Sequence, residues 1–509
     1  MADIPGAPFG SPRLPDWARL PCALAAGLTM ALGMAPYDLW YLACAGLVAA
    51  FFLFQTAPHG LGAIGVGWAI GLGYFGLALG WIIEPFMVDS AATGWMAPFA
   101  LFGMAAGLAL FWALPFWGAA HAGPRHALPT LVVAWTAAEL ARGYVLTGFP
   151  WALLGYIWAP VAPIQWVAVF GPYGLTFVTL ATAALAAMAL AHGKRRLWLG
   201  AGTLTLMLFL GGWALTPPMQ DLSGRPVVRL IQPNAAQHEK WQRDMIPVFF
   251  NRQVAFTAEP ARPGLSRPEL IIWPETALPM LLSNAGEALT TIATAGQGAR
   301  IVLGIQREQA GQFYNSLITV DEGGQVGQVY DKHHLVPFGE YMPAAAIFRR
   351  WNIAGLAARA QGGYSAGPGP RMLDLGPLGL ALPLICYEAV FPQDVYRAPM
   401  RPDMLLQITN DAWFGQWSGP YQHLAQARIR AIEQGLPLLR AANTGVSAII
   451  DGAGRTLAAL PLGTAGHVDM PLPEPLRRTT YSRTGDIPVL AWLFLCSCIL
   501  IVASRRKSG

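Results

Sequence analysis

The chain has 509 residues, of which 54% are hydrophobic and 12% are charged, and its formal net charge at pH 7 is +5. Ordinary soluble domains carry roughly 25% charged residues, so this composition excludes a chain that is soluble over its whole length. The basic residues cluster beside apolar segments, as in membrane proteins, so the net charge does not indicate a nucleic-acid partner. We therefore expect a membrane protein with an extramembrane part.

Apolar stretches long enough to cross a bilayer dominate the N-terminal part. Crossing a hydrocarbon core of about 30 Å takes about 20 helical residues. The candidate stretches lie near 20–36, 39–55, 61–83, 93–118, 127–145, 164–191, 197–215 and 487–503. The sequence therefore predicts a membrane domain of seven helices over 1–218, and an eighth helix with a basic tail over 485–509.

The positions of Lys and Arg predict the orientation, because basic residues in short loops stay on the cytoplasmic side. With the N-terminus inside, the inside segments contain Arg13, Arg19, Arg125, Lys194, Arg195, Arg196, Arg505, Arg506 and Lys507. The opposite loops contain Asp38, Glu84 and Asp89, and Arg142 is a basic exception. We therefore expect both termini in the cytoplasm and residues 219–484 on the outer face of the membrane.

Charged residues become frequent between 219 and 484, and short β-rich runs alternate there with helix-like stretches. The β-rich runs are VVRLIQPN, ELIIWPE, IVLGIQRE, FYNSLITV, LGLALPLICYE and MLLQITND. Apolar strands that alternate with helices are typical of sheets buried on both faces. This segment is therefore predicted to fold as one α/β domain.

Cys386 is the one cysteine of the predicted α/β domain, since the other four lie in predicted spans. It has no disulfide partner within its domain and no CxxC spacing for a metal. A lone thiol after an apolar strand is ordinarily a buried structural side chain. The alternative is a nucleophile, which needs a base, groups that stabilise an oxyanion and a proton donor.

Two other strand ends carry residues that suit those tasks. LIIWPETALP places Glu275 beside Trp273, and a partly apolar setting raises a carboxylate pKa toward the range of a general base. YDKHHLVPFGEYMP places Lys332 at a strand end and Glu340 in the following loop. Taken alone, each residue could equally be a turn carboxylate, a solvated lysine or a surface charge.

Two further motifs leave alternatives open. His333 and His334 lack additional ligands at a metal-binding spacing, so no metal site is expected. QITNDAWFGQWSGPYQH follows a strand with a loop rich in Trp, Phe and Gly. Such a loop either meets lipid at a membrane surface or packs its aromatic rings within the domain.

Taken in order, WPE, YDKHHLVPFGEYMP, CYE and NDAWFG resemble the apolipoprotein N-acyltransferase family, the integral-membrane branch of the nitrilase (carbon-nitrogen hydrolase) superfamily. The resemblance implies a four-layer αββα sandwich and a catalytic triad of Glu275, Lys332 and Cys386. No cofactor is expected.

The resemblance also implies a reaction. Glu275 is the base for Cys386, which attacks an ester of a phospholipid, typically phosphatidylethanolamine, while Lys332 stabilises the oxyanion. The resulting thioester passes its acyl chain to the α-amine of a diacylglyceryl-cysteine apolipoprotein, in the last step of lipoprotein maturation. The implied partners are the phospholipid donor, the diacylated acceptor and the bilayer. The implied location is a bacterial inner membrane, with the α/β domain in the periplasm.

Supporting residues are carried over from the family in the same way. Glu340 is expected beside the lysine, and Tyr387 and Glu388 are expected to support the nucleophile. The expected substrate-binding residues are Trp241, Asn315, Trp413 and Phe414.

Two other functions stay open at this point. A membrane-attached nitrilase-type amidase would share the triad and would need a small, enclosed, polar pocket. A transporter or lipoprotein-binding scaffold would be favoured by charged residues along a path through the membrane. The spans contain few such residues, and Glu139 and Arg142 are the nearest pair.

Overall fold

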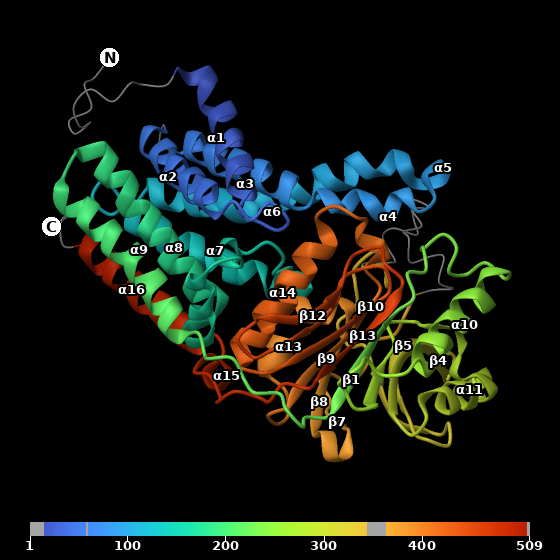
Figure 1. The fold of residues 1–509 in the computed structure, drawn as a ribbon. Coiled ribbons are helices and arrows are strands. Elements are labelled where there is room, and N and C mark those ends of the chain that lie inside the picture. Colours follow the sequence, from blue (N-terminus) through green and yellow to red (C-terminus); the bar gives the residue numbers. More distant parts are fainter. Residues whose placement is uncertain (1–14, 58–59, 344–362, 506–509) are drawn as a thin grey trace. The chain divides into compact units, whose positions relative to one another are not determined.

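Figure 1 shows the computed structural model of the protein, which describes residues 15–57, 60–343 and 363–505. The chain divides into two compact units. Met1–Pro217 and Thr480–Gly509 form one, here called the helical unit, and Pro218–Thr479 form the other, here called the α/β unit. The boundaries predicted from the sequence are 218 and 484.

The helical unit has a helix at each position where the sequence predicts a span. These helices are α1 (Asp16–Ala31), α2 (Trp40–Thr56), α3 (Leu61–Ala78), α6 (Ala97–Ala120), α7 (Ala127–Arg142), α8 (Val167–His192), α9 (Arg195–Leu215) and α16 (Ile487–Arg505). Shorter helices in this unit include α4 (Glu84–Met87), α5 (Ser90–Thr93), η4 (Leu154–Trp158) and α15 (Tyr481–Thr484).

The predicted number of eight spans is not confirmed. Within the described residues, five helical segments are long and apolar enough to cross a membrane: Leu61–Ala78, Ser90–Ala120, Ala162–His192, Arg195–Leu215 and Ile487–Ser504. α1, α2 and α7 contain 16, 17 and 16 residues. At about 1.5 Å per residue, helices of this length fall short of a hydrocarbon core of about 30 Å. Arg13, Arg506 and Lys507, which help to predict the orientation, lie outside the described residues.

Glu139 and Arg142 form a buried ion pair within the helical unit. The Arg142 guanidinium donates to both carboxylate oxygens of Glu139, at 3.0 to 3.2 Å. It also donates to the carbonyl oxygens of Phe149 and Trp151, and Trp112 donates its indole N–H to Glu139. Because all of these partners belong to the helical unit, the ion pair holds the chain after α7 in place. It gives no support to a transport path.

The α/β unit contains two mixed sheets. In the first, the strand order is β13-β1-β2-β4-β5-β6, and β3 also pairs with β4. Its strands are β1 (Val227–Gln232), β2 (Pro268–Ile272), β3 (Leu278–Leu281), β4 (Arg300–Gln309), β5 (Gln312–Val320), β6 (Val326–Asp331) and β13 (Gly466–Pro471). β1, β2 and β4 are parallel, and the pairs β1–β13, β4–β5 and β5–β6 are antiparallel.

The second sheet has the order β12-β11-β10-β9-β8-β7. Its strands are β7 (Leu373–Asp374), β8 (Leu380–Ile385), β9 (Met404–Thr409), β10 (Leu438–Ala442), β11 (Ser447–Ile450) and β12 (Thr456–Leu460). The three central strands β8, β9 and β10 are parallel, and they are buried along almost their whole length. This explains why they appear in the sequence as continuous apolar runs.

Helices cover the outer face of each sheet, and the inner faces pack together through β1 and β10 (Figure 1). The outer helices are α10 (Met245–Ala258) and α11 (Gly286–Gly296) on the first sheet, and α13 (Pro392–Tyr396) and α14 (Gly419–Gln434) on the second. The layers therefore follow the order αββα. The α/β domain predicted from the sequence is confirmed.

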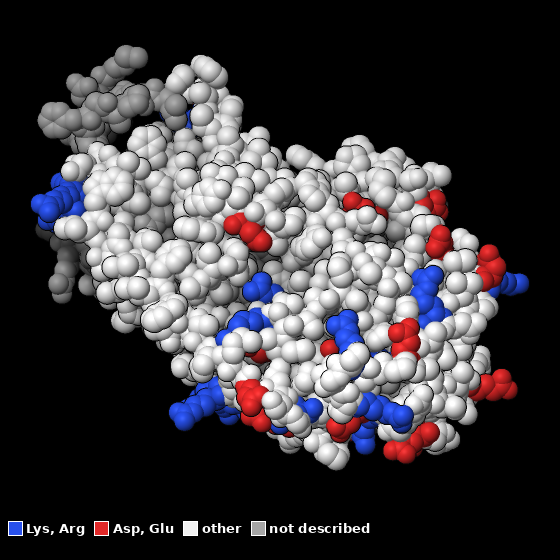
Figure 2. All heavy atoms as spheres, viewed as in Figure 1, with Lys and Arg blue, Asp and Glu red and all other residues white. Residues whose placement is uncertain are grey.

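The two units differ in surface charge. Figure 2 shows acidic and basic side chains spread over the visible face of the α/β unit and few over the helical unit. Between α8 and the first turn of α9, the side chains of Lys194, Arg195 and Arg196 are exposed. An uncharged helical surface is what a lipid environment requires.

Candidate active site

Each predicted triad residue follows a strand, two of them in the first sheet and one in the second. Glu275 comes after β2, Lys332 after β6 and Cys386 after β8. β6 runs parallel to β2 because two antiparallel pairings separate it from β4. The carboxyl ends of parallel strands are where open α/β sheets place their ligand sites. Glu275, Lys332 and Cys386 are 5%, 1% and 6% exposed, so they form a nearly buried group.

Glu275 has a defined partner on each carboxylate oxygen. The Asn315 side-chain amide donates to Oε1 at 2.6 Å, and the backbone N–H of Asn410 donates to Oε2 at 2.8 Å. Burial raises the pKa of Glu275 above the usual glutamate value, and this effect outweighs the opposing charge of Lys332. A carboxylate with a raised pKa is suited to accept a proton near neutral pH.

Lys332 lies between two carboxylates. Its Nζ donates to Glu340 Oε1 at 2.8 Å and lies 3.8 Å from Glu275 Oε1. Burial alone would lower the pKa of Lys332, but the charges of Glu340 and Glu275 raise it above the usual lysine value. The ammonium group therefore stays protonated and offers a fixed positive charge. Glu340 is positioned in turn by the backbone N–H of Val336, at 2.8 Å from Oε2.

Cys386 lies directly after β8 with a backbone φ of 52°. A non-glycine residue in the left-handed region stores about 1–3 kcal/mol of strain, which is common at functional sites. Burial and the charge of Glu275 raise the pKa of the Cys386 thiol, while Lys332 lowers it. The resting thiol therefore keeps its proton, so a nucleophilic role would require a base.

Glu388 joins the turn of Cys386 to the loop after β6. Its Oε2 accepts from the backbone N–H of Ile385 at 2.7 Å. Its Oε1 accepts from the hydroxyl of Tyr330 at 2.9 Å and from the backbone N–H of His333 at 2.8 Å. Because Glu388 is fully buried, loss of its charge would leave several donors unpaired. Both ends of the Cys386–Lys332 arrangement depend on this carboxylate.

Tyr387 and the two histidines belong to packing around that carboxylate. Tyr387 is buried and lies edge-on to Phe391, and His334 stacks on the same Phe391 ring. In the described parts of the chain, no group of three or more His, Cys, Asp or Glu side chains is arranged to bind a metal ion.

Lys240 is a residue that the sequence did not single out. It is buried, and its Nζ donates to Thr276 Oγ1 at 2.7 Å and to the carbonyl oxygen of Glu275 at 3.2 Å. Burial lowers the pKa of Lys240 to about 8, although the charge of Glu275 opposes this shift. In the segment HEKWQRD a lysine is ordinarily solvated, so no local signal reveals this role.

A second polar network under Cys386 was also missed. Gln407 donates to the carbonyl oxygen of Cys386 at 3.2 Å, and His423 Nε2 lies 3.0 Å from the same oxygen. Asp411 contacts His423 at 3.0 Å and Arg440 at 2.5 Å. Burial alone would raise the pKa of Asp411, but Arg440 and His423 lower it to about 2. This network supports the turn of Cys386 from the second sheet.

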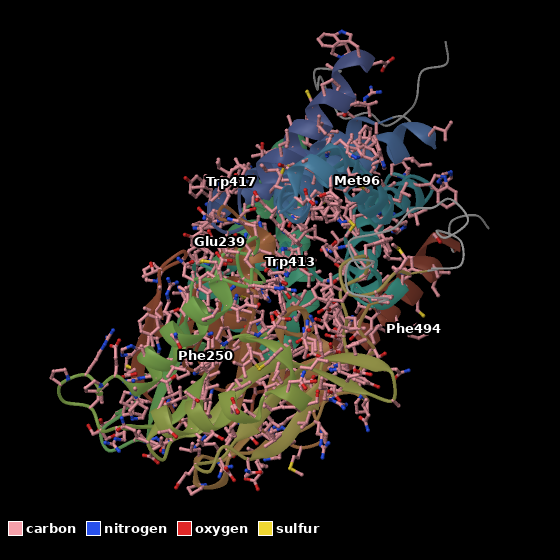
Figure 3. The ribbon with its side chains drawn as sticks, turned by 90° about the vertical axis from the view of Figure 1, so that its right-hand side faces the viewer. Met96, Glu239, Phe250, Trp413, Trp417 and Phe494 are labelled. Atoms are coloured by element: carbon pink, nitrogen blue, oxygen red, sulfur yellow. The ribbon has the colours of Figure 1, made fainter. Side chains whose placement is uncertain are left out.

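The four predicted substrate-binding residues fall into two groups. Asn315 is buried and bonds Glu275, and Phe414 is buried with its ring edge-on to His423. Trp241 and Trp413 are 43% and 37% exposed, and their described contacts do not reach the triad. Trp413 and the exposed Trp417 lie at the same end of the α/β unit as Glu239 (Figure 3).

Sequence comparisons relate both units to one family. The family model of the apolipoprotein N-acyltransferase N-terminal domain matches residues 26–185, and the carbon-nitrogen hydrolase model matches residues 235–477. Apolipoprotein N-acyltransferases of Rhodopseudomonas palustris and Caulobacter vibrioides are each 37% identical to the chain, over 97% of it and 96% of their own length. The chain belongs to the apolipoprotein N-acyltransferase family. The predicted family and activity are confirmed.

An amidase of the nitrilase superfamily from Nesterenkonia aligns with 52% of this chain and 96% of its own, at 17% identity and a TM-score of 0.37. That likeness is too distant to bear on activity. Membership of the apolipoprotein N-acyltransferase family makes the protein a membrane acyltransferase that acts on lipoproteins in a lipid setting. Its α/β unit is the nitrilase-like part.

The position of Glu275 depends on a close backbone approach by Gly304 of β4. A Cβ atom at Gly304 would lie 2.5 Å from Thr276 N and 2.7 Å from both Glu275 Cα and Pro274 O. Hydrogen bonds from Gly304 N to Pro274 O and from Ala277 N to Gly304 O fix the contact. A side chain at position 304 would therefore displace Glu275 itself.

We predict that Gly304→Ala slows N-acyl transfer about 10-fold or more, because even a small displacement of the predicted base Glu275 would lower the rate strongly. Overpacking should also lower the free energy of unfolding by about 1–3 kcal/mol. Transfer rates and denaturant unfolding of the purified protein would measure both effects. The control is Gly286→Ala in α11, where a Cβ meets nothing within 4 Å. A wild-type rate for Gly304→Ala would show that this contact does not position Glu275.

Proposed function

We propose that the enzyme transfers an acyl chain from a membrane phospholipid, with phosphatidylethanolamine the expected donor, to the α-amine of a diacylglyceryl-cysteine apolipoprotein through a thioester on Cys386. The observation that carries this proposal is the surroundings of the Cys386 thiol. A protonated lysine and a carboxylate with a raised pKa both act electrostatically on a thiol that is itself protonated at rest. These are the groups that acyl transfer through a thiol needs.

In the first half-reaction, Glu275 accepts the thiol proton as the sulfur attacks the donor ester. The carbonyl oxygen becomes an oxyanion, which the Lys332 ammonium stabilises. A fixed charge in a water-poor site is effective here because it needs no reorganisation during the reaction. When the ester C–O bond breaks, Glu275 returns the proton to the leaving oxygen. The products are a lysophospholipid and a thioester on Cys386.

In the second half-reaction, the α-amine of the acceptor attacks the thioester carbonyl. Glu275 accepts a proton from the amine, and Lys332 again stabilises the oxyanion. Collapse of this intermediate breaks the C–S bond and forms an amide, and the proton returns to the thiolate of Cys386. The near-complete burial of the three groups keeps water from competing with the amine.

The remaining site residues take supporting roles in this proposal. Glu340 orients Lys332, Glu388 fixes the Cys386 turn and Tyr387 packs beside it. Asn315 orients the base. Trp241, Trp413 and Phe414 contact substrate, the two tryptophans through their exposed ring surfaces.

The same proposal assigns a location. In the inner membrane, both termini lie in the cytoplasm and the α/β unit lies in the periplasm, where lipoprotein acceptors are presented. The support for this orientation is the distribution of Lys and Arg beside the apolar segments.

Incubation of the purified enzyme with phosphatidylethanolamine alone should leave an acyl group on Cys386. We expect an intact mass higher by one acyl chain, removed by hydroxylamine and mapped to the peptide that contains Cys386. Cys386→Ala should show no such mass, and Glu275→Gln should form it about 100-fold or more slowly. Cys496→Ser is the control and should acylate normally. A folded wild-type enzyme without an adduct would overturn the thioester step, and release of free fatty acid or turnover of small amides would favour an amidase.

The rate of this acylation should fall as the pH decreases, with a midpoint above the usual glutamate pKa of about 4.3. The reason is that Glu275 must be deprotonated to accept the thiol proton, and burial raises its pKa. Single-turnover rates between about pH 4 and pH 8 would give the midpoint. Glu308→Gln, which changes an exposed carboxylate, should leave the profile unchanged. A midpoint at or below the usual glutamate value would remove Glu275 from the base role.

Reporter fusions should distinguish the two sides of the membrane. Alkaline phosphatase joined near residue 300 is expected to be active, because it would lie in the periplasm, and a fluorescent protein at the C-terminus is expected to fluoresce in the cytoplasm. The reverse pattern would overturn the proposed orientation.

A further inference from the structure

An apolar cavity of about 570 Å³ lies within the helical unit between α2, α8 and α9. Trp40, Cys44 and Leu47 of α2 line one side, and small residues of α8 and α9, such as Ala183 and Ala201, line the others. Small side chains on two neighbouring helices would normally permit close packing. Here the small side chains leave a space between the helices. Of the residues in α9, only Ala201, Leu208 and Gly212 are buried, so the rest of this helix is at least partly exposed.

The hydroxyl groups in the cavity wall are already bonded. Thr179 Oγ1 donates to Leu175 O and accepts from the indole N–H of Trp158, both within 2.8 Å. Thr182 and Thr205 donate to backbone oxygens one turn earlier, at 2.8 and 2.9 Å. A buried water needs two to four polar partners. This wall offers hydrocarbon contact and suits an alkyl chain better than water or a polar group.

The length of the cavity matches one leaflet of a bilayer. It follows α9 from Trp198 to Phe209, which at about 1.5 Å per residue is about 16 Å. Half of a hydrocarbon core of about 30 Å is about 15 Å. The rings of Trp40, Trp158 and Phe209 meet at the Phe209 end, with centroids 5.3 to 5.9 Å apart. An alkyl chain entering at the Trp198 end would therefore stop at this aromatic cluster.

Three basic residues lie at the Trp198 end. Lys194 directly precedes α9, and Arg195 and Arg196 begin it; all three are exposed, and Arg195 lies one helical turn from Trp198 on the same side of the helix. The chain contains no Asp or Glu between Glu139 and Asp221, so no acidic residue nearby in sequence compensates this charge. A basic cluster beside an apolar space between membrane helices is complementary to an anionic lipid headgroup.

We propose that the helical unit binds one anionic phospholipid, with an acyl chain in the cavity between α2, α8 and α9 and its phosphate on Lys194, Arg195 and Arg196. The lipid fills the space that α9 leaves and stabilises its packing on α2 and α8. Its lining residues include none of the predicted catalytic or substrate-binding residues, so the site is assigned independently of the proposed reaction. In the predicted topology, this lipid belongs to the cytoplasmic leaflet.

Native mass spectrometry of the full-length protein in detergent tests the proposal. Phosphatidylglycerol and phosphatidylcholine with identical acyl chains are titrated separately. We expect one retained phosphatidylglycerol, bound about 10-fold or more tightly than phosphatidylcholine. Equal retention of the two lipids would overturn the headgroup assignment and with it the proposal.

Two sets of variants test the two parts of the site. Ala201→Trp fills the cavity and should abolish retention of the lipid. Leu210→Trp, on an exposed position of the same helix, should preserve it. Replacing Lys194, Arg195 and Arg196 by glutamine should remove the preference for phosphatidylglycerol. The charge-preserving changes Lys194→Arg, Arg195→Lys and Arg196→Lys should keep that preference. Unchanged retention in Ala201→Trp would overturn the assignment of the cavity.

A measurement on the unmodified protein guards against variants that fail to fold. Phosphatidylglycerol carrying a photoactivatable diazirine on its acyl chain is irradiated with the wild-type protein in vesicles. Cross-links should concentrate on peptides that contain Cys44, Ala183 and Thr205. A uniform distribution that includes the exposed face of α6 around Leu110 would contradict the proposed site.

Discussion

The ammonium group of Lys332 lies 2.8 Å from Glu340 and 3.8 Å from Glu275 in a place that is almost inaccessible to water. Two carboxylates around one buried cation leave the group with an excess negative charge, and this keeps the lysine protonated. Removing one partner of a buried ion pair is far more damaging than removing a surface charge. The geometry of the whole site follows from satisfying these three groups together.

The bonds that satisfy them come from both sheets. Glu275 follows β2 of the first sheet, yet its Oε2 accepts a hydrogen bond from the backbone N–H of Asn410, which follows β9 of the second sheet. Glu388 makes the converse contact: it follows β8 of the second sheet, and it accepts a hydrogen bond from the backbone N–H of His333 in the loop after β6 of the first sheet. A shift of one sheet against the other would break both contacts. The packed interface between the sheets therefore sets the distance between the predicted base and the predicted nucleophile.

The parts of this arrangement that have a local signature could be predicted from the sequence. Glu275, Lys332 and Cys386 each follow a strand, and the ordered motifs WPE, YDKHHLVPFGEYMP and CYE, which resemble those of the family, identify them together. Lys240 has no such signature, because its burial arises from a contact with Thr276 that is distant in sequence. Gly304 is similar, since its importance is the absence of a side chain opposite Glu275. The number of spans was harder to predict because apolar composition does not reveal where a helix of 16 residues ends.

The backbone of Cys386 also limits how the sulfur can move. The residue is in a left-handed conformation, and Glu388 bonds the residue before it, so the turn cannot rotate without breaking a buried hydrogen bond. Some acyl-transfer systems carry the chain between sites on a long flexible arm. In the reaction proposed for this enzyme, the acyl group would instead wait at one stationary point. Donor and acceptor must then visit the same place in turn, and each must leave before the other can enter.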